Sequence, residues 1–127
     1  METVEAHGVK LVLERPPTLT GGQGEKSEQE LLAVGTQVWD CAPAICDVLH
    51  CLLPESSLTP APCMCRGVLV EIGAGSGFCG LFAASKARHS LQVVLTDLDT
   101  LVPVLKTNRD ATLGSDAGCV HVLSLPW

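Results

Sequence analysis

A glycine-rich stretch follows an apolar run near the middle of the chain. It has the sequence VEIGAGSGFCG and covers residues 70–80. Glycine lets the backbone turn sharply and lets a ligand approach it closely, because glycine has no Cβ. Where such a loop opens a helix, unpaired backbone N–H groups and a partial positive charge face the ligand. The stretch therefore predicts a loop that holds a ligand close to its backbone.

Two glycine spacings fit this loop. Gly73, Gly75 and Gly77 match G-x-G-x-G, which is typical of S-adenosylmethionine sites, whereas Gly75, Gly77 and Gly80 match the dinucleotide form G-x-G-x-x-G. The apolar run ends at Ile72, so Gly73 is the first residue able to turn. The dinucleotide spacing leaves Gly73 without a role. The first spacing, and with it S-adenosylmethionine, is therefore favoured.

Two carboxylates belong to the same candidate site. Glu71 directly precedes the loop and has two interpretations: it binds the ammonium group of the cofactor, directly or through water, or it accepts a hydrogen bond from the loop backbone. Asp97 follows the next apolar run and lies 20 residues beyond Gly77. A carboxylate at the end of the second strand commonly binds ribose hydroxyls. We expect this role for Asp97 and keep a helix cap or a solvated turn residue as the alternative.

Alternating apolar segments must position these residues. Strands are predicted over 67–72, 91–96 and 119–125, a helix over 77–88, a second helix from Asp99 or Thr100 to Asp110, and a loop over 111–118. The order β-α-β-α-β predicts right-handed crossovers and a parallel, Rossmann-like α/β sheet.

The segment before this unit is predicted to be an extension of residues 1–34. Residues 8–13 and 31–34 are predicted as short strands that pair in a hairpin, with a polar loop or linker over 20–30. Asp40 is the expected N-cap of a helix that has Pro43 at its third position and stops at Pro54.

Composition narrows the function classes. The net charge is −6 and the eight Lys and Arg residues are scattered, which argues against a nucleic-acid surface. No apolar run reaches the roughly 20 residues needed to cross a bilayer, and the acidic N-terminus does not match a secretory signal. We therefore expect a cytoplasmic or nuclear protein without membrane partners. The seven cysteines are expected to be free thiols, and neither they nor the four histidines show metal-ligand spacing.

Several segments agree with one protein family. The chain resembles the seven-β-strand protein-lysine methyltransferases, the methyltransferase-like family 16 and family 21 group, over residues 35–127. The matching segments are Val38-Trp39-Asp40, VLVEIGAGSGFCGLFAA, VVLTDLDTLVPVLKTN and VHVLSLPW. The resemblance implies that residues 35–127 form the N-terminal half of a methyltransferase domain. It also implies that strands 1–3 of a seven-stranded sheet are present, in the order 1-2-3.

The resemblance further implies a cofactor site and an activity. It assigns S-adenosylmethionine binding to Trp39, Gly73, Ala74, Gly75, Asp97 and Trp127. Trp39 would close over the cofactor and Trp127 would lie beside the adenine, with core packing as the alternative for both. Pro126 departs from the Asp that usually precedes this Trp. The implied reaction is methyl transfer to a lysine of a non-histone protein, by family resemblance a chaperone or a translation-related protein; catalytic residues are not assigned.

Two other function classes remain open. The family's acidic-x-x-aromatic motif after strand 4 is not found, so we expect a C-terminally truncated chain with strand 67–72 as an exposed apolar edge. Such a chain would be a non-catalytic fragment or pseudoenzyme that binds a partner through that edge. A nicotinamide-dinucleotide oxidoreductase is the third class. The helix expected after Trp39 and Asp40 argues against it, since dinucleotide folds usually begin near their glycine strand.

Overall fold

A parallel three-stranded sheet forms the centre of the protein. The structure, a computed structural model, describes residues 1–17, 26–53, 67–87 and 90–126. The strand order is β3-β4-β5, and all neighbours are parallel. The strands and their connections are β3 (Gly67–Ile72), α3 (Phe78–Ala87), β4 (Leu91–Asp97), α4 (Val102–Leu113), the 3-10 helix η2 (Gly114–Cys119) and β5 (Val120–Ser124). The predicted mixed α/β class and the order of these three strands are confirmed.

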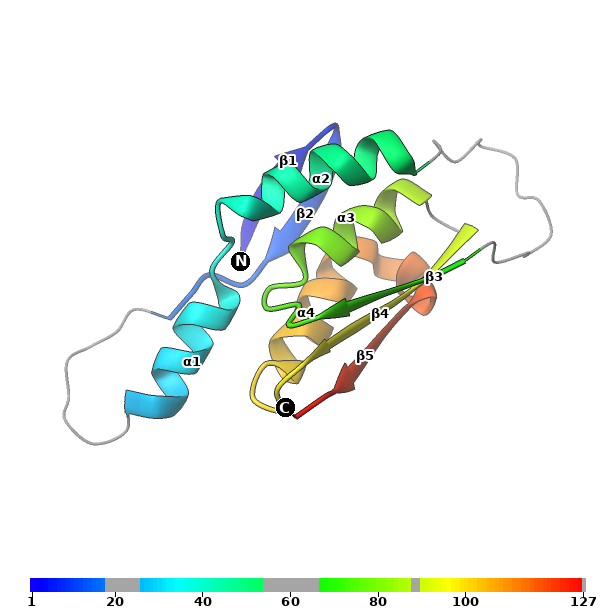
Figure 1. Cartoon of the computed structure of the whole chain (residues 1–127). Helices are drawn as coiled ribbons and strands as arrows, with labels where there is room; N and C mark the ends of the chain where they lie inside the picture. The colour runs from blue at the N-terminus through cyan, green and yellow to red at the C-terminus, as the bar shows by residue number, and fades with distance from the viewer. Residues whose placement is uncertain (18–25, 54–66, 88–89, 127) are drawn as a thin grey trace.

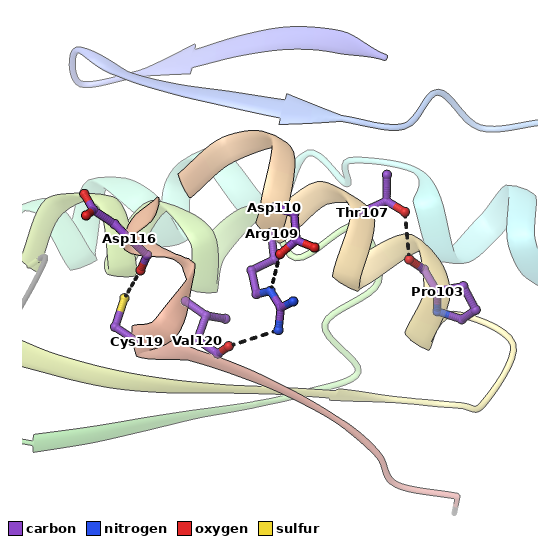
Figure 2. Close-up of polar contacts among 7 residues, drawn as sticks. All are labelled: Pro103, Thr107, Arg109, Asp110, Asp116, Cys119 and Val120. Carbon is purple, nitrogen blue, oxygen red and sulfur yellow. Dashed lines mark hydrogen bonds and ion pairs between the residues drawn. The ribbon is translucent and has the colours of Figure 1, made fainter. Parts of the chain in front are cut away.

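The elements stack in three layers (Figure 1). Helices α3 and α4 cover one face of the sheet, and an N-terminal hairpin lies on the far side of these helices, as Figure 2 shows at the top of its view. Helix α2 (Cys41–Leu52) packs beside α3. The largest fully buried side chains come from all three layers and are Phe82, Leu11, Leu13, Leu81, Leu95, Leu105, Val93 and Val120. The shared core therefore fixes α3 and α4 between the sheet and the hairpin.

The hairpin differs from the one predicted. β1 (Glu2–Ala6) pairs antiparallel with β2 (Val9–Leu13), and His7 and Gly8 between them both have positive φ, 47° and 76°. Two residues with positive φ are the signature of a type I′ turn. The expected strand 31–34 is wrong, because these residues lie in helix α1 (Lys26–Thr36). Glu, Gln, Leu and Ala, all good helix formers, dominate α1 and outweigh its two β-branched residues, Val34 and Thr36.

Contacts with α2 hold His7 in its unusual backbone conformation. His7 Nε2 lies 2.6 Å from Asp47 Oδ1, and its ring stacks on His50 with centroids 4.2 Å apart. A positive φ is disfavoured for any residue with a Cβ. The side-chain contacts offset this cost and join the hairpin turn to α2.

Helix α2 begins where it was predicted to begin. Cys41 is its first residue and Asp40 its N-cap, so Pro43 occupies the third position, where no backbone N–H is required. The Asp40 side chain makes no capping hydrogen bond, because its backbone is already helical (φ −58°, ψ −24°).

Both ends of α4 differ from the prediction. The helix begins at Val102 with Leu101 at the N-cap, so neither Asp99 nor Thr100 caps it. The expected loop 111–118 is wrong, because α4 continues to Leu113 and η2 follows. Gly114, with φ 55°, is the residue at which the α-helix ends.

Polar contacts fix α4 and η2 against β5 (Figure 2). Arg109 Nη1 donates to the Val120 carbonyl at 3.4 Å, and Arg109 Nε donates to Asp110 Oδ1 at 2.8 Å. The second bond lowers the pKa of Asp110. The Cys119 thiol donates to the Asp116 carbonyl at 3.1 Å and closes η2 just before β5 begins.

One face of the sheet is apolar and exposed. In β3 the side chains of Val68, Val70 and Ile72 are 68%, 58% and 68% exposed, while Leu69 and Glu71 between them face α3. Within the described part of the chain, β3 pairs with β4 alone. The prediction that strand 67–72 is an exposed apolar edge is therefore confirmed.

Candidate functional site

The candidate site lies at the carboxyl edge of the sheet. β3 and β4 are parallel and in register from Gly67 and Leu91 onward, so Ile72 and Asp97 end at the same edge. The glycine loop leaves β3 there, and the C-terminal end of α1 lies beside it (Figure 1). The parallel sheet thus brings together the loop and the carboxylate that the sequence places 20 residues apart.

The loop needs glycine at three positions. Gly73, Gly75 and Gly77 have φ values of 68°, 56° and 81°, in the left-handed region that favours glycine. Backbone bonds fix the turn: Ala74 N donates to the Thr96 carbonyl at 3.0 Å, and Gly77 N donates to the Ala74 carbonyl at 2.7 Å. The three positive-φ glycines are those of the G-x-G-x-G spacing.

Gly80, the last glycine of the dinucleotide spacing, is a packing glycine, as that spacing also expects of its third glycine. It lies inside α3, where an added Cβ would meet the side chains of Leu95 and Glu71. Its small size therefore serves the close packing of α3 on the sheet, and the packing alone accounts for this glycine.

The end of α1 closes the loop from the other side. The Gly35 carbonyl contacts Gly75 so closely that a Cβ on Gly75 would collide with it. Gly35 in turn lies against the buried Leu101, at the start of α4. The sequence pattern did not reveal this contact, because residues 31–34 were interpreted as a strand.

Replacing Gly75 with alanine is expected to destabilise the protein. The left-handed backbone costs an L-residue about 1–2 kcal/mol, and the collision with the Gly35 carbonyl adds to this cost. Urea unfolding should show a loss of about 2–4 kcal/mol. Gly118→Ala is the matched control, because a Cβ there meets nothing within 4 Å. Equal stability of the two variants would contradict the account of the loop.

Asp97 fastens the loop to the end of β4. The residue is 4% exposed; its Oδ2 accepts a hydrogen bond from Gly75 N at 2.7 Å, and its Oδ1 accepts one from Leu98 N at 2.8 Å. Asp97 is thus neither a solvated turn residue nor the cap of α4. A carboxylate has about four acceptor positions, so both oxygens keep capacity for a hydroxyl donor.

Glu71 lies between β3 and α3. Its Oε2 accepts a hydrogen bond from Gly80 N at 2.9 Å, so it contacts the backbone of α3 rather than that of residues 73–77. Burial raises the pKa of Glu71 to about 7, against the lowering effect of that hydrogen bond, and the negative charge of Asp97 adds to the rise. Glu71 therefore changes its charge close to neutral pH, at a position that directly precedes the loop.

Asn108 is a site residue that the sequence analysis did not single out. It is fully buried on α4; its Nδ2 donates to the Ser76 carbonyl at 2.9 Å, and its Oδ1 accepts from Glu14 N at 2.7 Å. One amide thus joins the glycine loop to the chain just after β2. The sequence did contain a signal for Asn108. It is the last residue of the segment VVLTDLDTLVPVLKTN, and a polar side chain on the buried face of a helix requires hydrogen-bond partners.

We expect Asn108→Ala to unfold at lower denaturant concentration than the wild type. The substitution leaves the Ser76 carbonyl and the Glu14 N–H without their partner, and each such group costs about 1–3 kcal/mol when it stays buried. The free energy of unfolding should fall by about 2–4 kcal/mol. Thr107→Ala, at the neighbouring position with an exposed hydrogen bond, is the control. A loss no larger than that of the control would show that Asn108 does not support the loop.

The two tryptophans differ in what the structure shows. Trp39 is 53% exposed and lies between α1 and α2, so its ring is accessible rather than part of the core. Trp127 lies outside the described residues. The expected roles of both in cofactor binding stay predictions.

The arrangement suits an adenosyl cofactor. Gly75 lies so close to the Gly35 carbonyl that no Cβ would fit, and Asp97 presents a fixed carboxylate. The Thr100 hydroxyl, on the turn that follows Asp97, is buried without a partner among the described residues. Ribose hydroxyls can donate hydrogen bonds to such carboxylates, and a cationic amino group can form a charge-assisted hydrogen bond with them. In the described ranges, no three His, Cys, Asp or Glu side chains are placed to hold a metal ion, and no helix is long and apolar enough to cross a membrane.

The family follows from comparison with known proteins. A family model described as lysine methyltransferase matches residues 24–127, which is most of the chain. The match includes α1, the glycine loop, Asp97 and Asn108, the parts that meet at the carboxyl edge of the sheet. The chain belongs to the lysine methyltransferase family.

Proposed function

We propose that this chain binds S-adenosylmethionine at the carboxyl edge of the sheet and serves methyl transfer to a lysine of a non-histone protein. Membership in the family supports the methyltransferase class and the cofactor. The observation that carries the location is the buried Asp97 carboxylate bonded to Gly75 N within a loop of three positive-φ glycines.

Each residue of the site has a proposed role. Asp97 accepts hydrogen bonds from the ribose hydroxyls, and Glu71 lies on the side of the amino-acid end. The loop backbone at Gly73, Ala74, Gly75 and Gly77 lines the site. Trp39 covers the cofactor and Trp127 borders the adenine. The accessible ring of Trp39 and the acceptor capacity of Asp97 support these roles.

The cofactor, when bound, supplies an electrophilic methyl group on a sulfonium centre. The work of this chain's residues is then to orient the cofactor and exclude water, so that the neutral lysine amine meets the methyl group in line. The acceptor is proposed to be a chaperone or a translation-related protein in the cytoplasm or nucleus.

Transfer of a labelled methyl group tests the activity. Purified protein is incubated with tritiated S-adenosylmethionine and a protein extract, and label is located by amino-acid analysis. Label in methyl-lysine that is absent with the Asp97→Asn variant is the expected result. Label in another residue type would overturn the lysine assignment.

A non-catalytic binding role is the second candidate, favoured by the exposed apolar face formed by Val68, Val70 and Ile72. Cofactor binding without transfer to any protein of the extract would support this second role. The nicotinamide-dinucleotide alternative is weakened because Gly73, which has no role in the dinucleotide spacing, turns the chain with a φ of 68°.

A further inference from the structure

A cavity lies at the far end of α3 and α4 from the glycine loop. Both helices begin near the carboxyl edge of the sheet and run back along it, so their last turns lie at the other edge. The cavity has a volume of about 220 Å³, which equals the space of about seven waters in the liquid. Its walls come from the hairpin, α3, α4 and η2 and include Val9, Lys10, Ala84, Ser85, Leu113 and Asp116.

Two residues of opposite charge line this cavity without pairing. Lys10 comes from β2 and Asp116 from η2, and neither forms an ion pair with another described residue. Asp116 is half-buried, and Figure 2 shows its carboxylate pointing from η2 toward the side of the hairpin. The Cys119 thiol bonds to the backbone carbonyl of Asp116, so this bond does not use the carboxylate. The cavity thus offers an ammonium group and a carboxylate that are separate from each other.

The backbone of Lys10 adds a second donor on this side. Ala6 pairs with Val9 across the two-residue turn, and such a flanking pair exchanges both of its backbone hydrogen bonds. The next residue of β2, Lys10, therefore directs its N–H and C=O away from β1. Val12, two residues further on, shows where this edge faces, because its N–H and C=O bond to the Thr112 hydroxyl on α4. The Lys10 N–H thus faces the cavity side as a donor.

A ligand with one anionic and one cationic group matches these walls. Its carboxylate accepts charge-assisted hydrogen bonds from the Lys10 ammonium and the Lys10 N–H. Its ammonium donates to Asp116 and to carbonyls in the last turns of α3 and α4, which have no partner within their helix and carry a partial negative charge. Val9, Ala84 and Leu113 supply apolar wall for a short aliphatic side chain. We propose that this cavity binds a small zwitterion of the α-amino-acid class with an aliphatic side chain.

Ligands with a single charge fit the cavity less well. A simple carboxylate would pair with Lys10 but would bring a like charge toward Asp116, and a simple amine would bring a like charge toward Lys10. A zwitterion avoids both repulsions and carries no net charge. The cavity lies away from the loop 73–77 and Asp97, so its occupancy does not depend on cofactor binding. Failure of this proposal is therefore distinguishable from failure of the proposed function.

Titration of the ¹⁵N-labelled protein with L-leucine, followed by amide chemical shifts, tests the proposal. Saturable shifts are expected at Val9, Lys10, Ser85 and Leu113, which line the cavity. Two matched compounds separate the charges: 3-methylbutylamine lacks the carboxylate, and 4-methylpentanoate lacks the ammonium group. Each should bind at least about 10-fold more weakly than L-leucine, because one charge-assisted hydrogen-bond partner is lost. Equal binding of all three compounds would contradict recognition of a zwitterion.

Two variants assign the site. Asp116→Asn and Lys10→Met should each weaken L-leucine binding at least about 10-fold, while amides far from the cavity keep their wild-type shifts and show that the fold is retained. Asp99→Asn makes the same change as Asp116→Asn at the carboxyl edge of the sheet and should bind like the wild type. The proposal is wrong if the wild-type shifts grow without saturation or spread over the whole surface. It is also wrong if Asp116→Asn and Asp99→Asn bind L-leucine equally well.

Discussion

Replacing Asp97 with asparagine is expected to weaken the binding of S-adenosylhomocysteine at least about 100-fold. Both carboxylate oxygens of Asp97 accept a backbone N–H, from Gly75 and from Leu98. Asparagine has one acceptor oxygen, so its amide NH2 would face one of these N–H donors. The glycine loop loses its attachment to β4, and the proposed ribose acceptor loses its charge.

Isothermal titration of wild type and variant measures this effect. Asp99→Asn is the matched control, because it removes the same charge two residues further along at an exposed position. The control should bind with wild-type affinity. Equal weakening in both variants would indicate a general charge effect and would remove Asp97 from the site.

Glu71→Gln is expected to make the protein more stable than the wild type at pH 8. The pKa of Glu71 is about 7 in the folded protein against 4.5 for an ordinary glutamate, because burial disfavours its charge. The folded state therefore binds more protons than the unfolded state between these values, and stability falls as pH rises from about 4.5 to about 7. The change of about 2.5 pKa units corresponds to about 3 kcal/mol.

Urea unfolding from pH 4.5 to 8 measures this dependence. The Gln variant keeps an acceptor for Gly80 N and has no charge to bury, so its free energy of unfolding should fall less steeply with pH than that of the wild type. Glu5→Gln, at an exposed position of β1, should retain the wild-type slope. Parallel curves for Glu71→Gln and the wild type would show that the buried carboxylate is not responsible. A weaker affinity of Glu71→Gln for S-adenosylhomocysteine would further support its place beside the amino-acid end.

The sheet was predictable from the sequence, because its strands are short apolar runs separated by helical periodicity. Residues 67–72 and 91–96 are nearly continuous apolar runs, and the structure places both within parallel strands. The hairpin partner was not predictable in the same way. Residues 2–6 are half-exposed and acidic, and their pairing depends on the left-handed turn at His7, which contacts with α2 stabilise.

The glycine loop and its attachment to Asp97 were predictable to different degrees. The spacing identified Gly73, Gly75 and Gly77 as turn residues, because glycine is the residue that most readily adopts a positive φ. The hydrogen bond from Gly75 to Asp97 depends on the pairing of β3 with β4, and the bond from Asn108 to Ser76 depends on how α4 packs against the loop; no local pattern encodes either contact. For the same reason, the contact between Gly35 and Gly75 followed only from the tertiary structure.

Calorimetric titration of the purified wild-type chain with S-adenosylhomocysteine, with NAD as the comparison ligand, tests the central claim most directly. We expect saturable binding of S-adenosylhomocysteine with one site per chain and no heat of binding for NAD. Binding of NAD alone, or binding of neither ligand by a folded sample, would contradict the assignment of the glycine loop and Asp97 to an S-adenosylmethionine site.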